Sequence, residues 1–263
     1  MTRVTSKPWL VLIRLSKKQR RNFLLGALGI AIGLGVWLAL VYFKLVPKYA
    51  LPTPVELGKL WQRESPRLLY NIWLTVMRAL CGFALGSIMA LFVTFIRSWI
   101  PVIDTFIEPI VQIFKPVPPL VLSPFMIIWF GSNNKGVITL AIWGSFFLML
   151  VEGHEALKAT PLVYLRAAST LGESKLGMRL RVMFPAAIPH LIGAMRITLL
   201  LGINLVILGE FSAAAGGIGE IIVHGYRFLR PDLLFFGVLV GIAVAVVLDL
   251  LVRIISIRLR RWV

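Results

Sequence analysis

The sequence predicts an all-α membrane protein with six transmembrane helices. Hydrophobic residues make up 59% of its 263 residues and the mean hydropathy is +0.89, which is too apolar for a soluble globular protein of this size. These residues are gathered into segments long enough to cross a bilayer, because a spanning helix needs about 20 apolar residues. The net charge of +17 does not indicate a nucleic-acid binder, since no soluble domain with one basic face is evident.

Six apolar segments are expected to cross the membrane. The third contains Lys115-Pro-Val-Pro-Pro119 and is too long for one straight helix, so we expect it to break or kink there. The first is too long for the apolar part of a signal peptide and should remain as an anchor. The expected spans are residues 23–43, 71–96, 102–130, 136–154, 187–209 and 233–256.

The distribution of Lys and Arg predicts that both termini lie in the cytoplasm. With the N-terminus inside, the inner segments hold 17 of these residues and the outer segments hold 8. Cytoplasmic loops carry this basic excess in membrane proteins. Residues 1–22 are then a basic cytoplasmic segment, and residues 23–263 form a transmembrane domain whose 155–189 loop is also cytoplasmic.

Two outer segments have a pattern of their own. Leu51-Pro-Thr-Pro54 precedes apolar residues spaced as on one face of a short amphipathic helix, and a plain connecting loop is an equal alternative. The 211–231 segment contains Gly216, Gly217 and Gly219 ahead of apolar residues. We expect a partly inserted hairpin or half-helix covered by protein there, because irregular backbone exposed to lipid is costly.

No set of residues indicates catalysis or a metal site. His154, His190 and His224 lie in different segments and are not expected to share a metal ion. The sequence also has no GxxxxGK[ST] motif for binding nucleotide phosphates. We therefore expect no enzyme activity and no cofactor in this chain, and any ATP and Mg that drive it would be bound by a separate subunit.

Polar residues inside the expected spans are candidates for a translocation path. Arg78, Lys115 and Arg196 would attract an anion, with Glu210 as a gate or partner charge, since charges at this depth must face protein or water. A structural interpretation is the alternative, in which the arginines snorkel or cap carbonyls and Glu210 pairs with a neighbouring chain. Three other candidates, which could equally join helices, are Trp129, Ser145 and Asn204.

The 155–189 loop has the features of a docking segment. Ala168 and Gly172 lie four residues apart, so on a rigid helix near 162–173 they would form one smooth face. Charged residues surround this face, and a soluble partner could grip it.

The segment Arg166-Ala-Ala-Ser-Thr-Leu-Gly172, followed by Pro185, resembles the cytoplasmic EAA loop of ABC importer permeases. In that family a short coupling helix in this loop docks in a groove of the ATPase subunit. Arg166 stands where the pattern has Glu, and Val182 and Phe184 also depart from it. The resemblance implies ATPase-coupling roles for Leu165, Arg166, Ala167, Ala168, Leu171, Gly172, Glu173 and Pro185.

The resemblance extends over most of the chain. Leu51-Pro-Thr-Pro54, Lys115-Pro-Val-Pro-Pro-Leu120, Ile128-Trp-Phe-Gly131 and Arg260-Arg-Trp262 look like the permeases for taurine, aliphatic sulfonates, nitrate and bicarbonate. It implies a type I ABC importer permease (MetI-like) fold in the bacterial inner membrane. It further implies a homodimer that works with two ATPase subunits and an extracytoplasmic solute-binding protein. The implied solute is a small anion, with taurine or a sulfonate as the first candidate and nitrate or bicarbonate as the next.

Two other classes compete with this interpretation. An ion-gradient-driven transporter or channel without ATPase subunits typically has interrupted spans in two related halves. The sequence shows one clear break, at Lys115–Pro119, and no internal repeat. An intramembrane enzyme would need a convergent nucleophile, base or metal set, which the sequence does not indicate.

Overall fold

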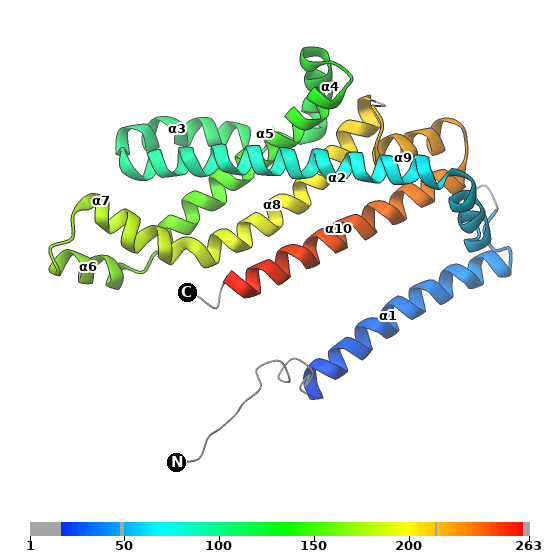
Figure 1. Ribbon diagram of the computed structural model, residues 1–263, viewed down its shortest axis with the longest axis horizontal. Coiled ribbons are helices and arrows are strands. Elements are labelled where there is room, and N and C mark those ends of the chain that lie inside the picture. Colours follow the sequence, from blue (N-terminus) through cyan, green and yellow to red (C-terminus); the bar gives the residue numbers. More distant parts are fainter. Residues whose placement is uncertain (1–16, 48–49, 214, 260–263) are drawn as a thin grey trace. The chain divides into compact units, whose positions relative to one another are not determined.

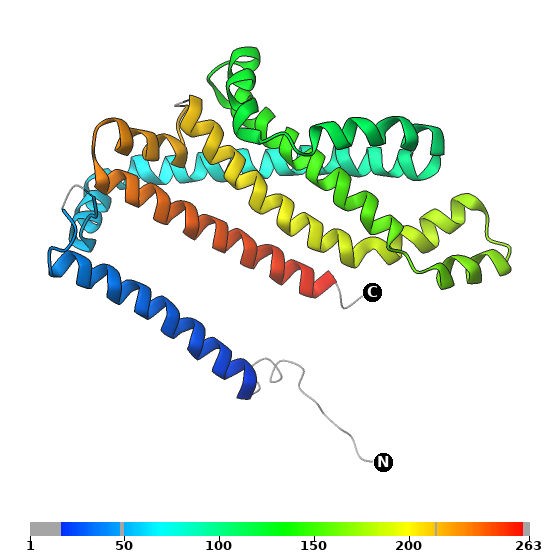
Figure 2. The same cartoon turned by 180° about the vertical axis from the view of Figure 1, so that it is seen from behind.

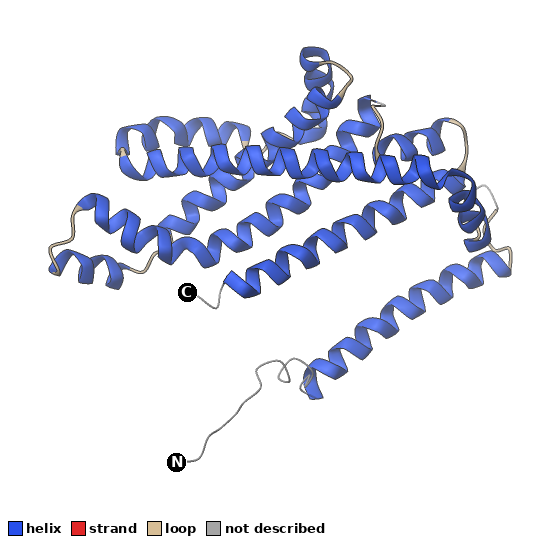
Figure 3. Ribbon diagram, in the orientation of Figure 1, coloured by secondary structure: helices blue, strands red, loops and turns tan. Residues whose placement is uncertain are grey.

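The computed structural model describes residues 17–47, 50–213 and 215–259, which are helical apart from turns and short connections, with no strand among them (Figure 3). The chain forms two units, residues 1–56 and 57–263. The first contains α1 (Lys17–Tyr42), whose stretch Leu24–Tyr42 is long and apolar enough to cross a membrane. Within this unit, the Trp37 indole donates a hydrogen bond of 3.2 Å to the Pro52 carbonyl. The basic residues before Lys17 and the Arg260-Arg-Trp262 motif lie outside the described residues.

The second helix begins at a capping box. The Thr53 N–H donates to the Glu56 carboxylate at 2.8 Å, and the Glu56 N–H donates to the Thr53 hydroxyl at 3.1 Å. From there α2 (Pro54–Trp99) runs for 46 residues. The segment after Pro54 is therefore helical, which is the first of the two alternatives expected from the sequence. It is not a separate short helix, because it continues into the second span. Pro66 lies inside α2, and the first turns of the helix run at an angle to the rest (Figure 1).

The third expected span is broken, as predicted. It consists of α3 (Pro101–Phe114) and α4 (Pro119–Phe130), which meet at an angle of 99°. The break covers residues 115–118. Pro116 lacks the N–H that would continue α3, and the fixed φ of Pro119 suits the first turn of a new helix. A bend of this size is far more than a kink, and it turns α4 away from α3.

Three further long helices complete the membrane part of the second unit: α5 (Asn134–Lys158), α8 (Phe184–Ala213) and α10 (Pro231–Leu259). Five described helices are long and apolar enough to cross a membrane, and the bent pair gives up to six crossings. This agrees with the six predicted spans. The cytoplasmic location of both termini remains a prediction.

The fifth span is longer than expected. A continuous helical stretch runs from α7 (Lys175–Gly177) through a π-helical turn (Met178–Met183) into α8, so that residues 175–213 form one rod instead of a span over 187–209. Pro185 lies directly after the π-helical turn, where its missing N–H removes an α-helical hydrogen bond. The Phe184 N–H instead reaches back five residues to the Arg179 carbonyl.

The core lies where α2, α5 and α8 cross, and small residues on α2 allow that approach. A Cβ atom on Gly82 would lie 2.4 Å from the Ala141 Cβ, and one on Gly86 would lie 2.6 Å from the Ile142 carbonyl oxygen. Helices α5, α8 and α10 lie side by side in that order (Figures 1 and 2). One buried apolar cluster joins them with α2: Ala79, Val137, Ala141, Leu199, Ile203, Val206 and Leu248.

We predict that Gly86→Ala lowers the thermal unfolding temperature. Its added methyl group would press on the backbone of α5, and overpacking of this kind costs about 1–3 kcal/mol. Gly193→Ala is the matched control, because a Cβ there meets nothing within 4 Å and replacing glycine in a helix otherwise stabilises by about 0.5–1 kcal/mol. Circular dichroism of both proteins in detergent measures the difference. An unchanged unfolding temperature for Gly86→Ala would show that α2 and α5 do not need their close contact.

Candidate functional site

The glycine-rich segment after α8 leads into a short buried helix, α9 (Ile218–Arg227). Gly216 and Gly217 have φ angles of +78° and +94°, which L side chains rarely adopt. A Cβ on Gly225 would lie 2.4 Å from the Leu234 backbone nitrogen, so α9 packs closely against α10. The half-helix expected from the sequence is therefore present and covered by protein.

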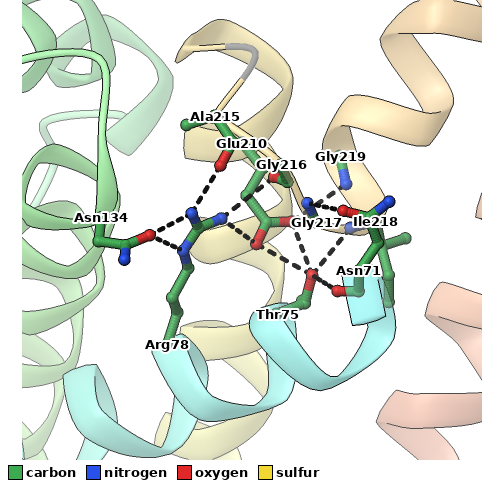
Figure 4. Close-up of polar contacts among 10 residues, drawn as sticks. All are labelled: Asn71, Thr75, Arg78, Asn134, Glu210, Ala215, Gly216, Gly217, Ile218 and Gly219. Carbon is green, nitrogen blue, oxygen red and sulfur yellow. Dashed lines mark hydrogen bonds and ion pairs between the residues drawn. The ribbon is translucent and has the colours of Figure 1, made fainter. Parts of the chain in front are cut away.

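A buried arginine connects this segment to three helices. Arg78 of α2 is 2% exposed, and its Nη1 donates to the Glu210 carboxylate of α8 at 2.8 Å (Figure 4). The guanidinium also donates to the carbonyls of Ala215 and Gly216, at 2.6 and 3.1 Å. Its remaining contacts go to the Asn134 amide oxygen at the start of α5. One side chain thus holds α2, α5, the end of α8 and the glycine segment together.

The Glu210 carboxylate completes the same network from the other side. It is fully buried and accepts hydrogen bonds from the Thr75 hydroxyl and from the Gly219 N–H, the latter at 3.1 Å. The Thr75 oxygen in turn accepts the Ile218 N–H at 2.8 Å, and the Asn71 amide oxygen accepts the Gly217 N–H at 2.8 Å. We call this set the polar clasp: Asn71, Thr75, Arg78, Asn134 and Glu210 (Figure 4).

The polar clasp corrects two expectations about the translocation path. Arg78 and Glu210 are buried within the chain and bound on several sides, so in this structure they join helices instead of lining a space for solute. Glu210 pairs with Arg78 of its own chain, where the structural interpretation had placed a neighbouring chain. The capping of carbonyls expected for Arg78 in that interpretation is what the structure shows.

The other five path candidates are spread over the second unit. Ser145 is fully buried, where α2 and α8 approach α5 at Gly86 and Gly202. Arg196 pairs across to Asp249 of α10, with Nη2 and Oδ2 2.5 Å apart. The remaining three are exposed: Lys115, Trp129 and Asn204.

One group of residues has the composition of a metal site. The ligand atoms of Asp104, Glu108 and His154 lie within 4.8 Å of one another. The Arg97 guanidinium, whose residue is 2% exposed, donates to Asp104 at 2.7 Å and to Glu108 at 2.5 Å. Arg97 already pairs with both carboxylates, so the cluster joins α2 to α3 through ion pairs, and His154 of α5 lies 3.7 Å from Asp104.

The docking segment of the 155–189 loop is α6 (Leu162–Thr170), which ends in a Schellman motif. The Gly172 N–H donates to the Ser169 carbonyl and the Glu173 N–H donates to the Ala168 carbonyl, at 3.1 and 3.0 Å. Gly172 has a φ angle of +74°, in the left-handed region. The glycine therefore ends the helix, and the helix does not continue to residue 173 as expected.

This ending changes the expected docking face. Ala168 is only 8% exposed and points into the chain, while Gly172 lies beyond the helix, so the two do not share a smooth face. The exposed residues at helical spacing are Val163, Ala167 and Leu171, with Val163 and Leu171 exposed by 70% and 87%. Ala167 is thus the small residue on the outward face, between two apolar side chains.

The loop is tied to the helices on either side of it. The Arg179 Nε donates to the Ser98 carbonyl at the end of α2, at 2.7 Å. Ser174 caps α7 by accepting the Gly177 N–H at 3.0 Å. Glu173 is partly buried and lies 3.4 Å from the Arg181 guanidinium, whereas Arg166 and Pro185 are exposed and Leu165 is half-buried.

Comparison with known proteins identifies the family. Residues 82–261 match the family described as "Binding-protein-dependent transport system inner membrane component". The chain belongs to this family. It is 27% identical to the taurine transport system permease protein TauC of Escherichia coli, over 89% of this chain and 87% of that protein. It is 24% identical to the putative aliphatic sulfonates transport permease protein SsuC of Bacillus subtilis, over 93% and 90%.

Solved structures show the same fold. The inward-facing MetNI methionine ABC transporter matches with a TM-score of 0.64 and 20% identity, over 76% of this chain and 97% of that one. An amino acid ABC transporter crystallised with histidines matches with a TM-score of 0.61 and 16% identity, over 76% and 96%. The predicted MetI-like ABC permease fold is thereby confirmed, and the chain is an ABC transporter permease component of the inner membrane.

Sequence reasoning missed three members of the polar clasp: Asn71, Thr75 and Asn134. A signal for two of them was present, because Asn71, Thr75 and Arg78 follow the i, i+4, i+7 spacing of one helix face within an apolar segment. Asn134 gave no such signal, since it is one of two asparagines in a polar turn.

Removal of either charge of the clasp should destabilise the protein strongly. We predict that Arg78→Gln and Glu210→Gln each lower the free energy of unfolding by about 3–5 kcal/mol, because each leaves a buried charge without its partner. Replacing both, as in Arg78→Met with Glu210→Leu, should cost less than the sum of the two single changes. Chemical unfolding in mild detergent measures these differences.

Arg67→Gln is the control for this experiment. Arg67 is 56% exposed and pairs with Glu64 at 3.6 Å, so its loss should cost less than about 1 kcal/mol. Similar costs for Arg67→Gln and Arg78→Gln would contradict the structural importance of the clasp.

We predict that Gly172→Val loosens the end of α6 and Gly172→Asn does not. The left-handed conformation costs an L residue about 1–2 kcal/mol, and asparagine tolerates it better than a β-branched residue. Amide hydrogen exchange of residues 168–173 is the measurement, with faster exchange expected for the valine variant alone. A Cβ at Gly172 meets nothing within 4 Å, so a difference between the variants would come from the φ angle and not from a steric contact. Equal exchange in both variants would show that the left-handed φ angle does not hold the end of α6 together.

Proposed function

We propose that this chain is the membrane permease of an ATP-driven importer that moves a small anionic solute into the cytoplasm. Taurine or a related sulfonate is the first candidate, with nitrate and bicarbonate next. The names of two relatives support sulfonates, since one transports taurine and the other is assigned to aliphatic sulfonates. Family membership supports a role that depends on a solute-binding protein.

The observation on which the proposal rests is the outward face of α6. Val163 and Leu171 expose most of their apolar surface on either side of Ala167, in a loop that the charge distribution assigns to the cytoplasm. Exposed apolar surface beside charged residues is typical of a protein interface. We propose an ABC ATPase subunit as the occupant, which binds the ATP and Mg that this chain has no motif to bind.

A mechanical route leads from this face to the outer half of the protein. ATP binding closes the ATPase pair and displaces α6, which packs on the π-helical turn. Residues 175–213 form one continuous rod that ends at Glu210 and the glycine segment. Movement of α6 therefore reaches the polar clasp, and the hydrogen bond from Arg179 to Ser98 carries it to α2 as well.

The assembly we propose contains two copies of this chain, two ATPase subunits and an extracytoplasmic solute-binding protein, in the bacterial inner membrane with both termini cytoplasmic. Coupling roles are assigned to the exposed residues Arg166, Ala167, Leu171 and Pro185. The other members of the set hold the helix in place. Leu165 and Ala168 do so through burial, Gly172 through the helix end, and Glu173 through its contact with Arg181.

We predict that Ala167→Trp abolishes ATP-driven uptake while the protein still reaches the membrane. A bulky side chain on the outward face should hold α6 away from its groove, so ATP hydrolysis no longer follows solute delivery. Uptake of labelled taurine and ATP hydrolysis by the assembly are both measured in proteoliposomes. We expect the uptake rate to fall at least about tenfold, a factor that corresponds to a free-energy difference of about 1.4 kcal/mol.

The matched control is Ala31→Trp, an exposed position in the middle of α1, which should leave coupling intact. Copurification of the wild-type chain is the complementary test, because an ATPase with a GxxxxGK[ST] motif should accompany it. Uptake that follows an ion gradient without any ATPase would favour an ion-gradient-driven transporter or channel and refute the proposal.

A further inference from the structure

A cavity of about 270 Å³ lies beside the break between α3 and α4. Pockets that bind drug-sized molecules usually measure about 300–1,000 Å³, so this one suits a smaller solute. Trp143, nine residues from the start of α5, and Glu152, six residues from its end, both line the cavity. It therefore extends from the middle of the span towards the inner end. Other residues that border it are Phe114, Lys115, Phe147 and Leu201.

Two opposite charges line this cavity without pairing. Neither Lys115 nor Glu152 forms a salt bridge anywhere in the part of the chain that the structure describes. Charged side chains at membrane depth normally pair or face water, because hydrocarbon solvates them poorly. The clasp and the Arg97 cluster satisfy this requirement within the chain. Lys115 and Glu152 are left to water or to a bound solute.

Aromatic rings and helix ends also border the cavity. Trp143 and Phe147 have ring centroids 5.0 Å apart, and Phe147 and Phe114 have centroids 5.5 Å apart. These three rings also line the cavity, and aromatic faces attract ammonium groups. The cavity therefore offers a cation both these rings and the Glu152 carboxylate. Pro119, the first residue of α4, also borders the cavity, but the negative end of the α3 dipole lies at Lys115 itself. The attraction for an anion therefore comes from the lysine charge.

We infer that this cavity binds a small zwitterion on its way through the membrane, with Lys115 on its oxyanion group and Glu152 on its ammonium group. The inference rests on the proposed function and narrows the solute, from any small molecule with an anionic group to a zwitterion that also bears an amine, as taurine does. A plain anion, such as an alkyl sulfonate or nitrate, would satisfy Lys115 but would be repelled by Glu152.

The test compares two solutes of similar size, taurine and ethanesulfonate, which lacks the amine. Binding of each tritiated solute is measured on the purified permease–ATPase assembly in lipid nanodiscs. Wild type should bind taurine at least about tenfold more tightly than ethanesulfonate. Lys115→Gln should weaken both by about tenfold or more, whereas Glu152→Gln should weaken taurine by that factor and leave ethanesulfonate unchanged or tighter.

Lys59→Gln is the matched control, an exposed lysine near the start of α2 and away from the cavity, which should change neither affinity. Unfolding temperatures of all variants should equal that of wild type, since neither charge has a partner in the chain. Equal affinities of wild type for the two solutes, no measurable binding, or the same effect of Glu152→Gln on both would overturn the inference.

Uptake into proteoliposomes separates this inference from the proposed function. If ATP still drives uptake of a solute but the selectivity follows neither Lys115 nor Glu152, only the assignment of the cavity is wrong. If no ATPase accompanies the chain and ATP drives no uptake, the proposed function itself is wrong.

Discussion

The architecture of the second unit depends on one buried ion pair, between Arg78 of α2 and Glu210 near the C-terminal end of α8. Both charges are out of water, so each requires hydrogen bonds from all sides, and the chain supplies them from α5, from Thr75 and from the glycine segment. A buried pair of this kind is a demanding constraint, because it is stable only when every partner is in place. The start of α9, with its two left-handed glycines, is accordingly shaped around a carboxylate: a Cβ on Gly217 would lie 2.1 Å from the Glu210 carboxyl carbon.

The clasp lies at one end of a rod whose other end is the docking loop. Residues 175–213 are helical without interruption, and the π-helical turn before Pro185 keeps the chain wound where a proline would otherwise open it. In the assembly that we propose, a rigid connection of this length would let an ATPase at α6 move the glycine segment without a separate relay. Because α6 ends at Gly172 in a left-handed turn, its outward face is set by Val163, Ala167 and Leu171.

The charges of the membrane part fall into two groups, those paired within the chain and those that line a cavity without a partner among the described residues. Arg78 with Glu210 and Arg97 with Asp104 and Glu108 are satisfied within the chain and join its helices. Lys115 and Glu152 share a cavity and pair with neither each other nor another described residue, at the place where α3 and α4 are broken. A break in a span leaves polar backbone and helix ends in the membrane, which is tolerated where they line a cavity. The broken helix and the unpaired charges thus lie at the same place, where we propose that a solute binds.

The sequence by itself determined the helical membrane class, the number of spans, the break at Lys115–Pro119 and the family, because hydropathy, proline chemistry and motif spacing act locally along the chain. It also placed Arg78, Lys115 and Glu210 among the residues of interest, since a charge in an apolar segment is visible without a structure. Only the tertiary structure decided that Arg78 meets Glu210, 132 residues later in the chain, while Lys115 stays unpaired. The same holds for the docking face, where Ala167 and not Ala168 points outward. Which partner a charge finds, and which face of a helix is covered, depends on how distant segments pack, and that information is not present in any local pattern.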